Sequence, residues 1–249
     1  MNIKENSKIL KLSYVFKNYE NEIKEAKQTK KDYEEFLDEL LEKEINQRKE
    51  NGIKKRIRYA KFPIKKYLED FDRKLYNPEF IKEFEELDTL DFIEKKENII
   101  LVGTPGAGKT HYAIGLGIKA CMDGKSVLFI SVPNLIIELK EAMSRSQLTA
   151  YKRKFEKFDL VILDELGYVS FDKEGCEILF NLLSNRNDKG SIIITTNLTF
   201  DRWEEIFKDA MLTGAIVDRL AYKAHILDLS RNVSHRYEET VSWKNSKNM

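Results

Sequence analysis

A glycine-rich segment directly after a short apolar run constrains the fold of this chain more than any other feature. The apolar run is Ile99–Val102, and residues 103–110 follow it with the pattern G-x-x-x-x-G-K-T. Glycines permit the tight backbone turns that point several N–H groups at one phosphate. Such a pattern between a buried strand and a helix is a P-loop, which binds a nucleoside triphosphate. The sequence therefore predicts a strand, a phosphate-binding loop and a helix, in that order.

The loop residues also predict how a nucleoside triphosphate and Mg²⁺ are held. Lys109 can reach the β- and γ-phosphates, and the Thr110 hydroxyl can ligate Mg²⁺. A helix that begins near Lys109 directs its positive dipole end at the same phosphates. We expect the nucleotide to contact the whole loop and the residue after it, namely Gly103, Thr104, Pro105, Gly106, Ala107, Gly108, Lys109, Thr110 and His111.

Two adjacent carboxylates end a second apolar run. A strand is predicted near 159–163, and Asp164 and Glu165 follow it. A Mg²⁺ site that already holds phosphates has little use for two carboxylates. Asp164 therefore suits the Mg²⁺ shell, and Glu165 suits a general base for the water that attacks the γ-phosphate. The alternative is a solvated turn after a core strand.

Two further polar side chains are candidates for the same chemistry. Asn197 ends the apolar run 191–196, where it could hold the attacking water or sense the γ-phosphate. Arg219 lies in an otherwise apolar helical stretch. It is either an arginine finger that acts on the nucleotide of an adjacent subunit, or the partner of Asp218 or Asp209 on a solvated helix face.

Six short motifs, taken together and in order, resemble those of the IstB-like AAA+ ATPases. This family comprises transposition helper proteins of bacterial insertion sequences, and it is related to the DnaC helicase loaders and the DnaA initiator. The resemblance covers about residues 30 to 237. The motifs are Arg58–Pro63, Leu68–Asp72, Gly108–His111, Asp164–Tyr168, Thr195–Asn197 and Val217–Leu220.

The resemblance implies roles for particular residues. The loop and the two carboxylates keep the roles given above, Asn197 becomes the sensor residue, and Arg219 becomes the finger that acts in trans. Arg236 lies in Ser234–Arg236, where the family usually has Ser-Tyr-Arg, which makes it a candidate second sensor that contacts the nucleotide. The implied cofactors are ATP and Mg²⁺. The implied partners are duplex DNA, a cognate transposase and further copies of this chain.

Charge is segregated along the chain, although its net value is only +1. Residues 43–66 contain ten basic and two acidic side chains, whereas residues 67–98 contain five basic and eleven acidic ones. DNA binding depends on the local field, so a near-neutral total does not argue against it. The alternatives are a solvated linker and a face that pairs with the acidic stretch. The candidate phosphate contacts are Lys54, Lys55, Arg56, Arg58 and Lys61.

A second basic segment follows the strand expected at 127–131. Two helices are predicted there, near 133–143 and 147–157, where one would suffice. In the initiator and helicase-loader relatives of the family, an extra helix at this place faces nucleic acid. A charged solvent face is the alternative. The candidate DNA contacts are Arg145, Lys152, Arg153 and Lys154.

Strands that alternate with helices predict an α/β fold with a five-stranded parallel sheet covered on both faces. The expected strands lie near 99–102, 127–131, 159–163, 191–196 and 225–229. Few residues follow the last strand, so no large C-terminal lid is expected. We expect a helical N-terminal domain for DNA or a partner over 1–62, a linker over 63–98 and an AAA+ P-loop ATPase domain over 99–249.

Apolar spacing gives more detail in the helices. It predicts a helix from about 30 to 49 that begins at a Thr29/Asp32 capping box and ends at Asn51-Gly52. An earlier helix is expected around 14–26. The two cysteines, Cys121 and Cys176, lie in helical stretches, so buried free thiols are expected.

The residues predict an ATPase, and the family resemblance implies that it is stimulated by DNA, assembles on DNA, remodels it and passes it to a transposase. A DnaC-like helicase loader is the alternative within the same class. A P-loop kinase would need a lid and an acceptor pocket, and a nucleotide-gated scaffold would not need Glu165. The N-terminus has no apolar core of signal-peptide length, and no stretch approaches the roughly 20 apolar residues of a membrane span, which predicts a cytoplasmic protein.

Overall fold

The computed structural model describes residues 2–168, 170–186 and 188–230. The chain divides into two compact units, Met1–Lys55 and Arg56–Met249, and each is described by itself. In the part of the chain that is described, no helix has both the length and the apolar character needed to cross a membrane.

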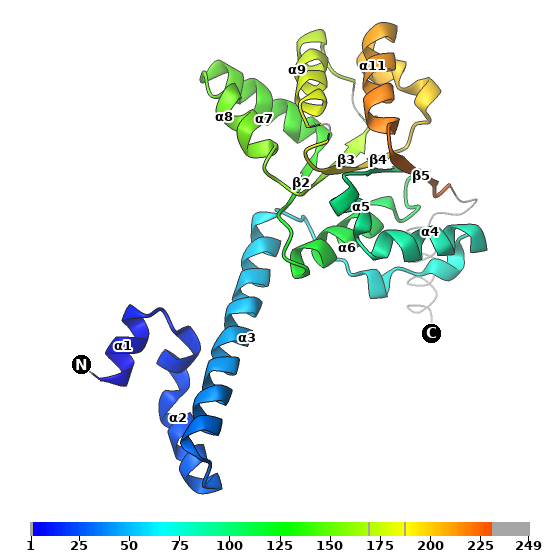
Figure 1. Cartoon of the computed structure of the whole chain (residues 1–249). Helices are drawn as coiled ribbons and strands as arrows, with labels where there is room; N and C mark the ends of the chain where they lie inside the picture. The colour runs from blue at the N-terminus through cyan, green and yellow to red at the C-terminus, as the bar shows by residue number, and fades with distance from the viewer. Residues whose placement is uncertain (1, 169, 187, 231–249) are drawn as a thin grey trace, which may run out of the picture. The chain divides into compact units, whose positions relative to one another are not determined.

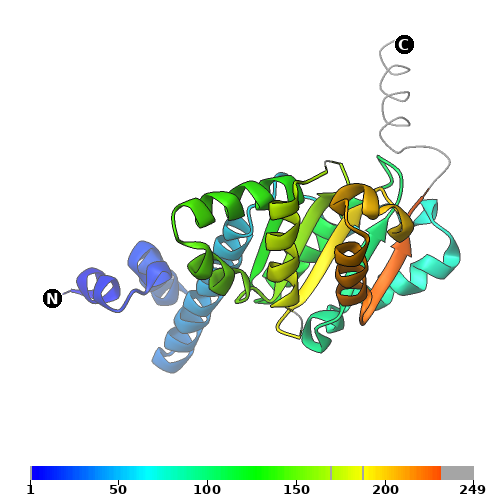
Figure 2. The same ribbon diagram turned by 90° about the horizontal axis from the view of Figure 1, so that it is seen from above.

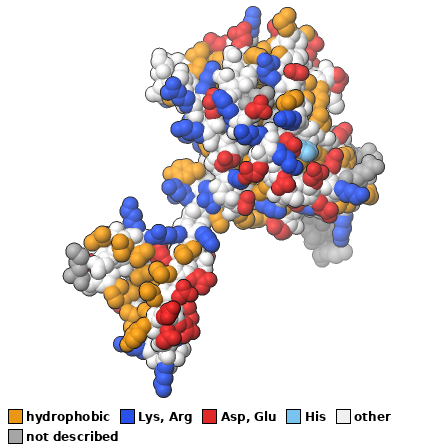
Figure 3. All heavy atoms as spheres, viewed as in Figure 1, with side chains coloured by type: hydrophobic (Ala, Val, Ile, Leu, Met, Phe, Trp, Pro, Cys, Tyr) orange, Lys and Arg blue, Asp and Glu red, His pale blue; other side chains and the backbone are white. Residues whose placement is uncertain are grey.

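The first unit is built from α1 (Ile3–Ile9), α2 (Ser13–Thr29) and the greater part of α3 (Tyr33–Tyr59) (Figure 1). Val15 is the only hydrophobic side chain among its described residues that is fully buried. Hydrophobic side chains gather instead on the surface of this unit, beside a row of acidic side chains (Figure 3). The unit therefore has almost no core of its own.

A buried carboxylate joins α2 to α3. Glu44 is 3% exposed and accepts hydrogen bonds from the backbone N–H groups of Ser13, Tyr14 and Val15, at 3.0, 2.7 and 3.3 Å. These N–H groups begin α2 and have no partner within the helix. Burial raises the pKa of the Glu44 carboxyl, but the hydrogen bonds from these groups and from Arg48 outweigh it and lower the pKa below its usual range.

Helix α3 differs from its expected bounds at both ends. The side chain that caps it is that of Asp32, which accepts from the Glu35 N–H at 2.8 Å, whereas Thr29 is the last residue of α2. The predicted capping box at Thr29 is therefore wrong. The helix also continues through Asn51-Gly52 to Tyr59. A single glycine inside a helix costs only about 1 kcal/mol relative to alanine, which the turns on either side can offset.

The second unit contains a five-stranded parallel sheet in the order β2-β3-β4-β1-β5 (Figures 1 and 2). Four of the strands are buried along almost their whole length, as expected where helices cover both faces of a parallel sheet. The predicted five-stranded sheet is thereby confirmed. The strands are β1 (Asn98–Val102), β2 (Val127–Ser131), β3 (Leu160–Leu166), β4 (Ser191–Thr196) and β5 (Ala224–Asp228).

Helices cover the two faces of this sheet and bury alternate residues of each strand. In β1, Ile99 and Leu101 belong to one core, and Ile100 and Val102 belong to the other. The helices of the first face are α4 (Pro78–Asp88), α5 (Asp91–Lys95) and α6 (Lys109–Met122) (Figure 1). Those of the second are α7 (Val132–Ser144), α8 (Leu148–Phe155), α9 (Lys173–Ser184) and α11 (Ala210–Ala221). The remaining short helices are η1 (Leu68–Asp70), η2 (Arg73–Leu75), η3 (Phe200–Arg202) and α10 (Glu204–Phe207).

Residues 63–98 pack onto the second unit instead of forming the expected linker. Phe71, Phe84 and Leu87 are buried in the same core as the apolar face of α6. The ring of Phe84 lies 4.7 Å from that of Tyr112, measured between centroids. Most of the acidic side chains described in this segment are exposed, but Asp88 is half-buried and accepts from the Tyr112 hydroxyl at 3.2 Å, so the segment is part of the sheet-containing unit.

The two cysteines are buried free thiols, as predicted. Cys121 lies in α6 and Cys176 lies in α9. Burial raises the pKa of the Cys121 thiol to about 11. At neutral pH this thiol is protonated and behaves as a small apolar side chain.

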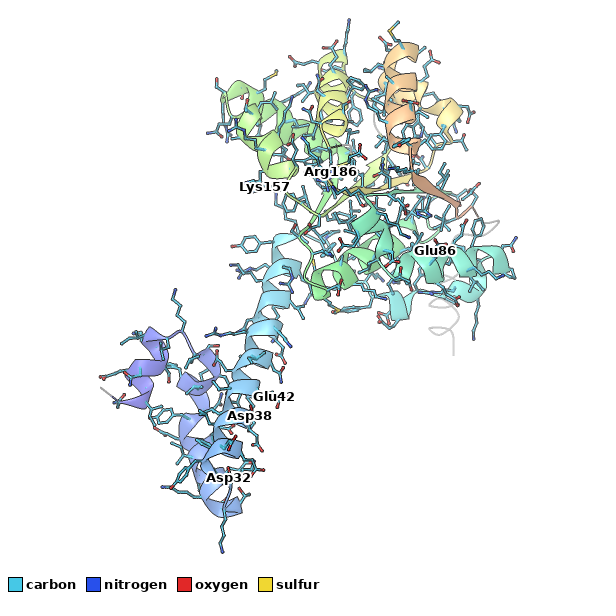
Figure 4. All side chains as sticks on the ribbon, in the orientation of Figure 1. Asp32, Asp38, Glu42, Glu86, Lys157 and Arg186 are labelled. Atoms are coloured by element: carbon cyan, nitrogen blue, oxygen red, sulfur yellow. The ribbon has the colours of Figure 1, made fainter. Side chains whose placement is uncertain are left out.

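A fully buried arginine lies at the amino ends of the strands. Arg186, labelled in Figure 4, donates from Nη1 to the Phe155 carbonyl at 2.9 Å. Its Nη2 donates to the carbonyls of Phe158 and Ser191, at 2.7 and 3.1 Å. Burial lowers the pKa of the guanidinium to about 10. The side chain thus joins the end of α8 to the beginnings of β3 and β4.

Candidate nucleotide-binding site

The loop between β1 and α6 has the backbone conformation that its glycines allow. Gly106 and Gly108 have φ angles of 82° and 85°. A Cβ atom at Gly108 would lie only 2.6 Å from the hydroxyl oxygen of Tyr76, so a larger residue would clash there. Helix α6 begins directly afterwards at Lys109. The first N–H groups of a helix have no partner within it, so they are available to a phosphate.

Lys109 lies inside the loop. The residue is 6% exposed, and its ammonium group donates to the carbonyl oxygens of Gly103 and Thr104, at 2.6 and 2.9 Å. Burying an ammonium group is costly unless it has hydrogen-bond partners. Phosphate oxygens are stronger partners than carbonyls because they carry charge. The position fits the predicted contact with the β- and γ-phosphates.

Two hydroxyl side chains meet at the carboxylate of Asp164, near the end of β3. Asp164 is 6% exposed, and its Oδ1 accepts from the Thr110 hydroxyl at 2.9 Å. The same oxygen accepts from the Thr195 hydroxyl at 2.5 Å. Hard oxygen ligands of this kind are the ones that Mg²⁺ prefers. Thr110 and Asp164, the two predicted Mg²⁺ ligands, are therefore already adjacent.

Glu165 follows Asp164 in an unusual backbone conformation. Its φ is 64°, in the left-handed region that few residues other than glycine adopt. Its N–H donates to the Thr195 hydroxyl oxygen at 3.0 Å. The side chain is exposed, whereas that of Asp164 is buried. Strained backbone of this kind is concentrated at functional sites, and here it separates the directions of two successive carboxylates.

Asn197 follows β4 beside these groups. Its Oδ1 is buried and has no hydrogen-bond partner among the described residues. A Cβ atom at Gly167 would lie 3.0 Å from that oxygen, so Gly167 leaves room beside it. Because most buried polar atoms in proteins are paired, an unpaired one calls for an explanation such as a ligand or water. Asn197 is therefore placed as expected for a residue that contacts a ligand.

The structure brings five of the predicted site residues to one edge of the sheet. The strands β3, β4 and β1 are neighbours, and their carboxyl ends lead to the two acids, the amide and the loop. The residues are Lys109, Thr110, Asp164, Glu165 and Asn197. The buried ammonium, the paired oxygen ligands and the unpaired amide oxygen all fit a nucleoside triphosphate with Mg²⁺.

Aromatic residues from the segment before β1 support the loop, and the sequence analysis missed them. Tyr76 donates its hydroxyl to the Ala107 carbonyl at 2.6 Å. Phe71 stacks on Tyr76 and also meets the ring of His111. His111 Nε2 lies 3.0 Å from the Tyr67 carbonyl, so this side chain joins α6 to η1, although it was expected at the nucleotide. Only the density of aromatics over 67–84 could have indicated this packing.

Arg219 lies away from this edge. Its guanidinium stacks 4.7 Å from the centroid of Phe180, and its Nη1 donates to the Ala215 carbonyl. The carbonyl of the next residue, Leu220, accepts from the side chain of Asn98, which is the first residue of β1. Arg219 is thus near the amino end of β1, whereas the loop follows its carboxyl end. Arg236, the candidate second sensor, lies outside the described residues.

The candidate DNA contacts are surface residues with different surroundings. Arg56 is half-buried, and its Nε donates to the Cys121 carbonyl at 2.7 Å, which indicates a structural role. Lys61 pairs with Glu138 at 3.3 Å, and Arg145 pairs with Glu141. Lys152 is half-buried. The exposed residues among these candidate contacts are Lys54, Lys55, Arg58, Lys61, Arg145, Arg153 and Lys154.

Comparison with known proteins identifies a family. The model of the family described as IstB-like ATP binding protein matches residues 5–242. An ATP-binding protein of insertion sequence IS21 from Pseudomonas aeruginosa is 37% identical over 230 residues, which cover 92% of this chain and 86% of that protein. One of insertion sequence IS5376 from Geobacillus stearothermophilus is 36% identical, over 83% of this chain and 82% of that protein. This chain belongs to the IstB-like ATP-binding family.

Solved structures support the fold. The helicase loader DnaC matches with a TM-score of 0.53 at 21% identity, over 61% of this chain and 93% of that one. DnaI matches with a TM-score of 0.55 at 19% identity, over 68% of this chain and 90% of that one. DnaA from Aquifex aeolicus, solved with bound AMPPCP, gives 0.58 at 16% identity, over 74% of this chain and 56% of that one. The second unit is therefore a P-loop α/β domain like those of DnaC and DnaA.

Proposed function

We propose that this member of the IstB-like ATP-binding family hydrolyses ATP with Mg²⁺, assembles on duplex DNA and presents that DNA to a transposase. The observation that carries the proposal is the meeting of Lys109, Asp164, Glu165 and Asn197 at the carboxyl ends of three adjacent strands. Binding alone would need only the loop. The exposed Glu165 beside a buried Asp164 adds the arrangement that hydrolysis needs.

Each residue has a distinct task in this proposal. Lys109 exchanges its carbonyl partners for the β- and γ-phosphate oxygens. Thr110 and Asp164 would hold Mg²⁺, which would neutralise charge that develops on the phosphates. Glu165 accepts a proton from the attacking water, because its carboxylate is free of the bonds that hold Asp164. Asn197 orients that water or the γ-phosphate through its amide.

The position of Arg219 favours action between subunits. Arg219 is near the amino end of β1, and the loop of its own subunit begins after the carboxyl end. A strand rises about 3.3 Å per residue, so the length of β1 is about 13 Å, and this strand lies between the Leu220 carbonyl, next to Arg219, and the loop. We propose that Arg219 completes the site of a neighbouring copy, which makes hydrolysis dependent on assembly.

The proposal that the chain binds DNA and a transposase is supported by its relatives and by the basic side chains on its surface. The two relatives described above belong to insertion sequences. Lys54, Lys55 and Arg58 present ammonium and guanidinium groups on the exposed surface of α3. Arg153 and Lys154 do the same on α8. Such groups bind the phosphate backbone without sequence preference.

A helicase-loading role is the second candidate, because DnaC and DnaI share the fold of the second unit. The two roles differ in the partner. Addition of the cognate transposase should stimulate ATP turnover by the DNA-bound chain if it is a transposition helper. Stimulation by a replicative helicase, with none by the transposase, would favour the loader.

The direct test of the proposed function is steady-state ATP hydrolysis with and without duplex DNA. We expect phosphate release that requires Mg²⁺ and increases when duplex DNA is added. The Lys109→Ala variant serves as the control, because it removes the ammonium group that fills the loop. Equal rates for the wild type and this variant would contradict hydrolysis at this site. A rate that duplex DNA does not change would contradict the proposal that DNA binding stimulates hydrolysis.

A further inference from the structure

The strand pairing beside the two acids is irregular, and a single residue of β4 opposes both of them. Leu163 pairs with Ile194, and Leu166 pairs with Thr196. Two residues of β3 therefore lie between these pairs, and only Thr195 lies between their partners in β4. Such a bulge re-aims side chains and leaves the extra residue without its regular partner.

The Thr195 hydroxyl compensates for this irregularity. It donates to Asp164 Oδ1 at 2.5 Å and accepts from the Glu165 N–H at 3.0 Å. Thr195 is 1% exposed, so water has little access to replace these bonds. A hydroxyl group can donate and accept at once, which valine of the same shape is unable to do. One buried hydroxyl therefore holds the side chain of one acid and the backbone of the other.

We propose that Thr195 is a positioning residue for hydrolysis, which fixes Asp164 toward the metal position and Glu165 in its left-handed conformation. This inference rests on the proposed ATP hydrolysis. Thr110 also donates to Asp164, but Thr110 is the expected Mg²⁺ ligand. Thr195 is the donor that can stay with Asp164 throughout the cycle. It links the metal-binding acid to the base, so that the two are held in one geometry.

The consequence is an effect on turnover more than on nucleotide binding. The Thr195 hydroxyl makes no hydrogen bond to Lys109 or to the loop, which are the parts of the site expected to hold the phosphates. Loss of that hydroxyl frees Glu165 to leave a strained backbone conformation and lets Asp164 rotate. Small displacements of catalytic groups reduce rates by up to about 10²-fold.

The test compares Thr195→Val, Thr195→Ser and a control in the same strand. The control is Ser191→Ala, which removes a buried hydroxyl bonded to the Phe92 carbonyl at the opposite end of β4. For Thr195→Val we expect kcat to fall about 10- to 100-fold, with the KM for ATP and the Kd for a fluorescent ATP analogue within about threefold of wild type. Half-maximal rate should also need more Mg²⁺. Thr195→Ser and Ser191→Ala should keep kcat within about threefold.

Three results would overturn the inference. One is a Thr195→Val variant with kcat within twofold of wild type, and another is Thr195→Ser as impaired as Thr195→Val. The third is a loss confined to KM and nucleotide affinity. Thermal unfolding of each variant establishes that it is folded, and Thr195→Ala replaces Thr195→Val if the latter does not fold. Absence of ATPase activity in the wild type would instead contradict the proposed function, and it is measured first.

Discussion

The two edges of the sheet both carry buried polar side chains, but they use them differently. At the amino edge, Arg186 donates to three backbone carbonyls. Asn98 likewise bonds only main-chain groups, the Leu220 carbonyl and the Ile192 N–H. At the carboxyl edge, Asp164 is held by two hydroxyl side chains. The bonds at the amino edge join separate elements of the fold, whereas the partners at the carboxyl edge, the two hydroxyls at Asp164 and the loop carbonyls at Lys109, lie where a ligand would bind.

This difference teaches which buried polar groups belong to stability and which to chemistry. At the carboxyl edge, Glu165 has a strained backbone and Asn197 has a buried oxygen with no partner among the described residues. Both are unfavourable for the fold alone. Left-handed backbone at Lys96 and, within the described part of the chain, an unpaired Nε on Arg186 occur at the amino edge as well, so the indication comes from where these features lie. Strain and an unpaired oxygen beside a loop that fits phosphates indicate that the carboxyl edge is shaped for a ligand.

The largest effect is expected on ATP turnover from a change at Arg219, which lies near the amino edge of the sheet, away from the loop of its own subunit. If Arg219 acts on a neighbour, Arg219→Ala should lower turnover by about 10³-fold or more and leave nucleotide binding intact. Mixing it with Lys109→Ala should restore activity, because some interfaces then pair an intact loop with an intact arginine. The measurement is ATP hydrolysis across mixing ratios. Rates equal to the sum of the two separate variants would place the role of Arg219 within its own subunit.

An intermediate effect is expected from Arg186. Replacing it with methionine removes three hydrogen bonds to backbone carbonyls, so the free energy of unfolding should fall by about 3 kcal/mol. Arg153→Met, at an exposed arginine of α8, is the matched control and should change stability by less than about 0.5 kcal/mol. Urea unfolding measures both. If Arg186→Met unfolds like the wild type but loses ATP affinity, the distinction between the edges is wrong.

The smallest effect is expected on the surface of α3. Changing Lys54, Lys55 and Arg58 to alanine should weaken duplex binding. The slope of log affinity against log salt should flatten by about 0.9 for each DNA phosphate that the variant no longer neutralises. Nucleotide affinity should not change, because the loop residues that hold the phosphates of ATP are left intact. Arg56 is left in place for its bond to Cys121.

A control of equal charge separates direct binding to phosphates from a general reduction in positive charge. Three exposed lysines of α2, changed together, should leave the slope within about 0.5 of the wild-type value if α3 itself binds the DNA backbone. An equal change in both triple variants would show that net charge alone is responsible. The control residues are Lys17, Lys24 and Lys27.

Much of the fold of the second unit can be predicted from the sequence, because the patterns that mark its strands and its loop are local. Apolar runs mark the strands, and the carboxyl ends of parallel strands meet at one edge. The sequence alone therefore predicts that Asp164, Glu165 and Asn197 lie near the loop. The family resemblance, on residues from about 30 to 237, was confirmed by the match to residues 5–242.

Other features depend on contacts between distant residues and have no local signal. The hydroxyl of Thr195 has the same sequence pattern as any β-branched strand residue, and its role depends on a bulge in β3. Arg186 looks like a surface arginine until the carbonyls around it are known. The glycine at 52 is a common helix stop, yet α3 continues past it. Residues 63–98 have an acidic composition, which gives no indication that their aromatic side chains pack into the core.

The most direct test of the account is the Glu165→Gln variant. The amide keeps the size of the side chain and loses its basicity, so ATP binding and assembly on duplex DNA should persist while turnover falls about 10²- to 10⁴-fold. Because Glu165 is exposed, thermal stability should not change. Phosphate release, ATP affinity and DNA-dependent sedimentation are measured on the same preparation. Turnover within a few-fold of wild type, or loss of nucleotide binding together with turnover, would contradict the assignment of this edge to ATP hydrolysis.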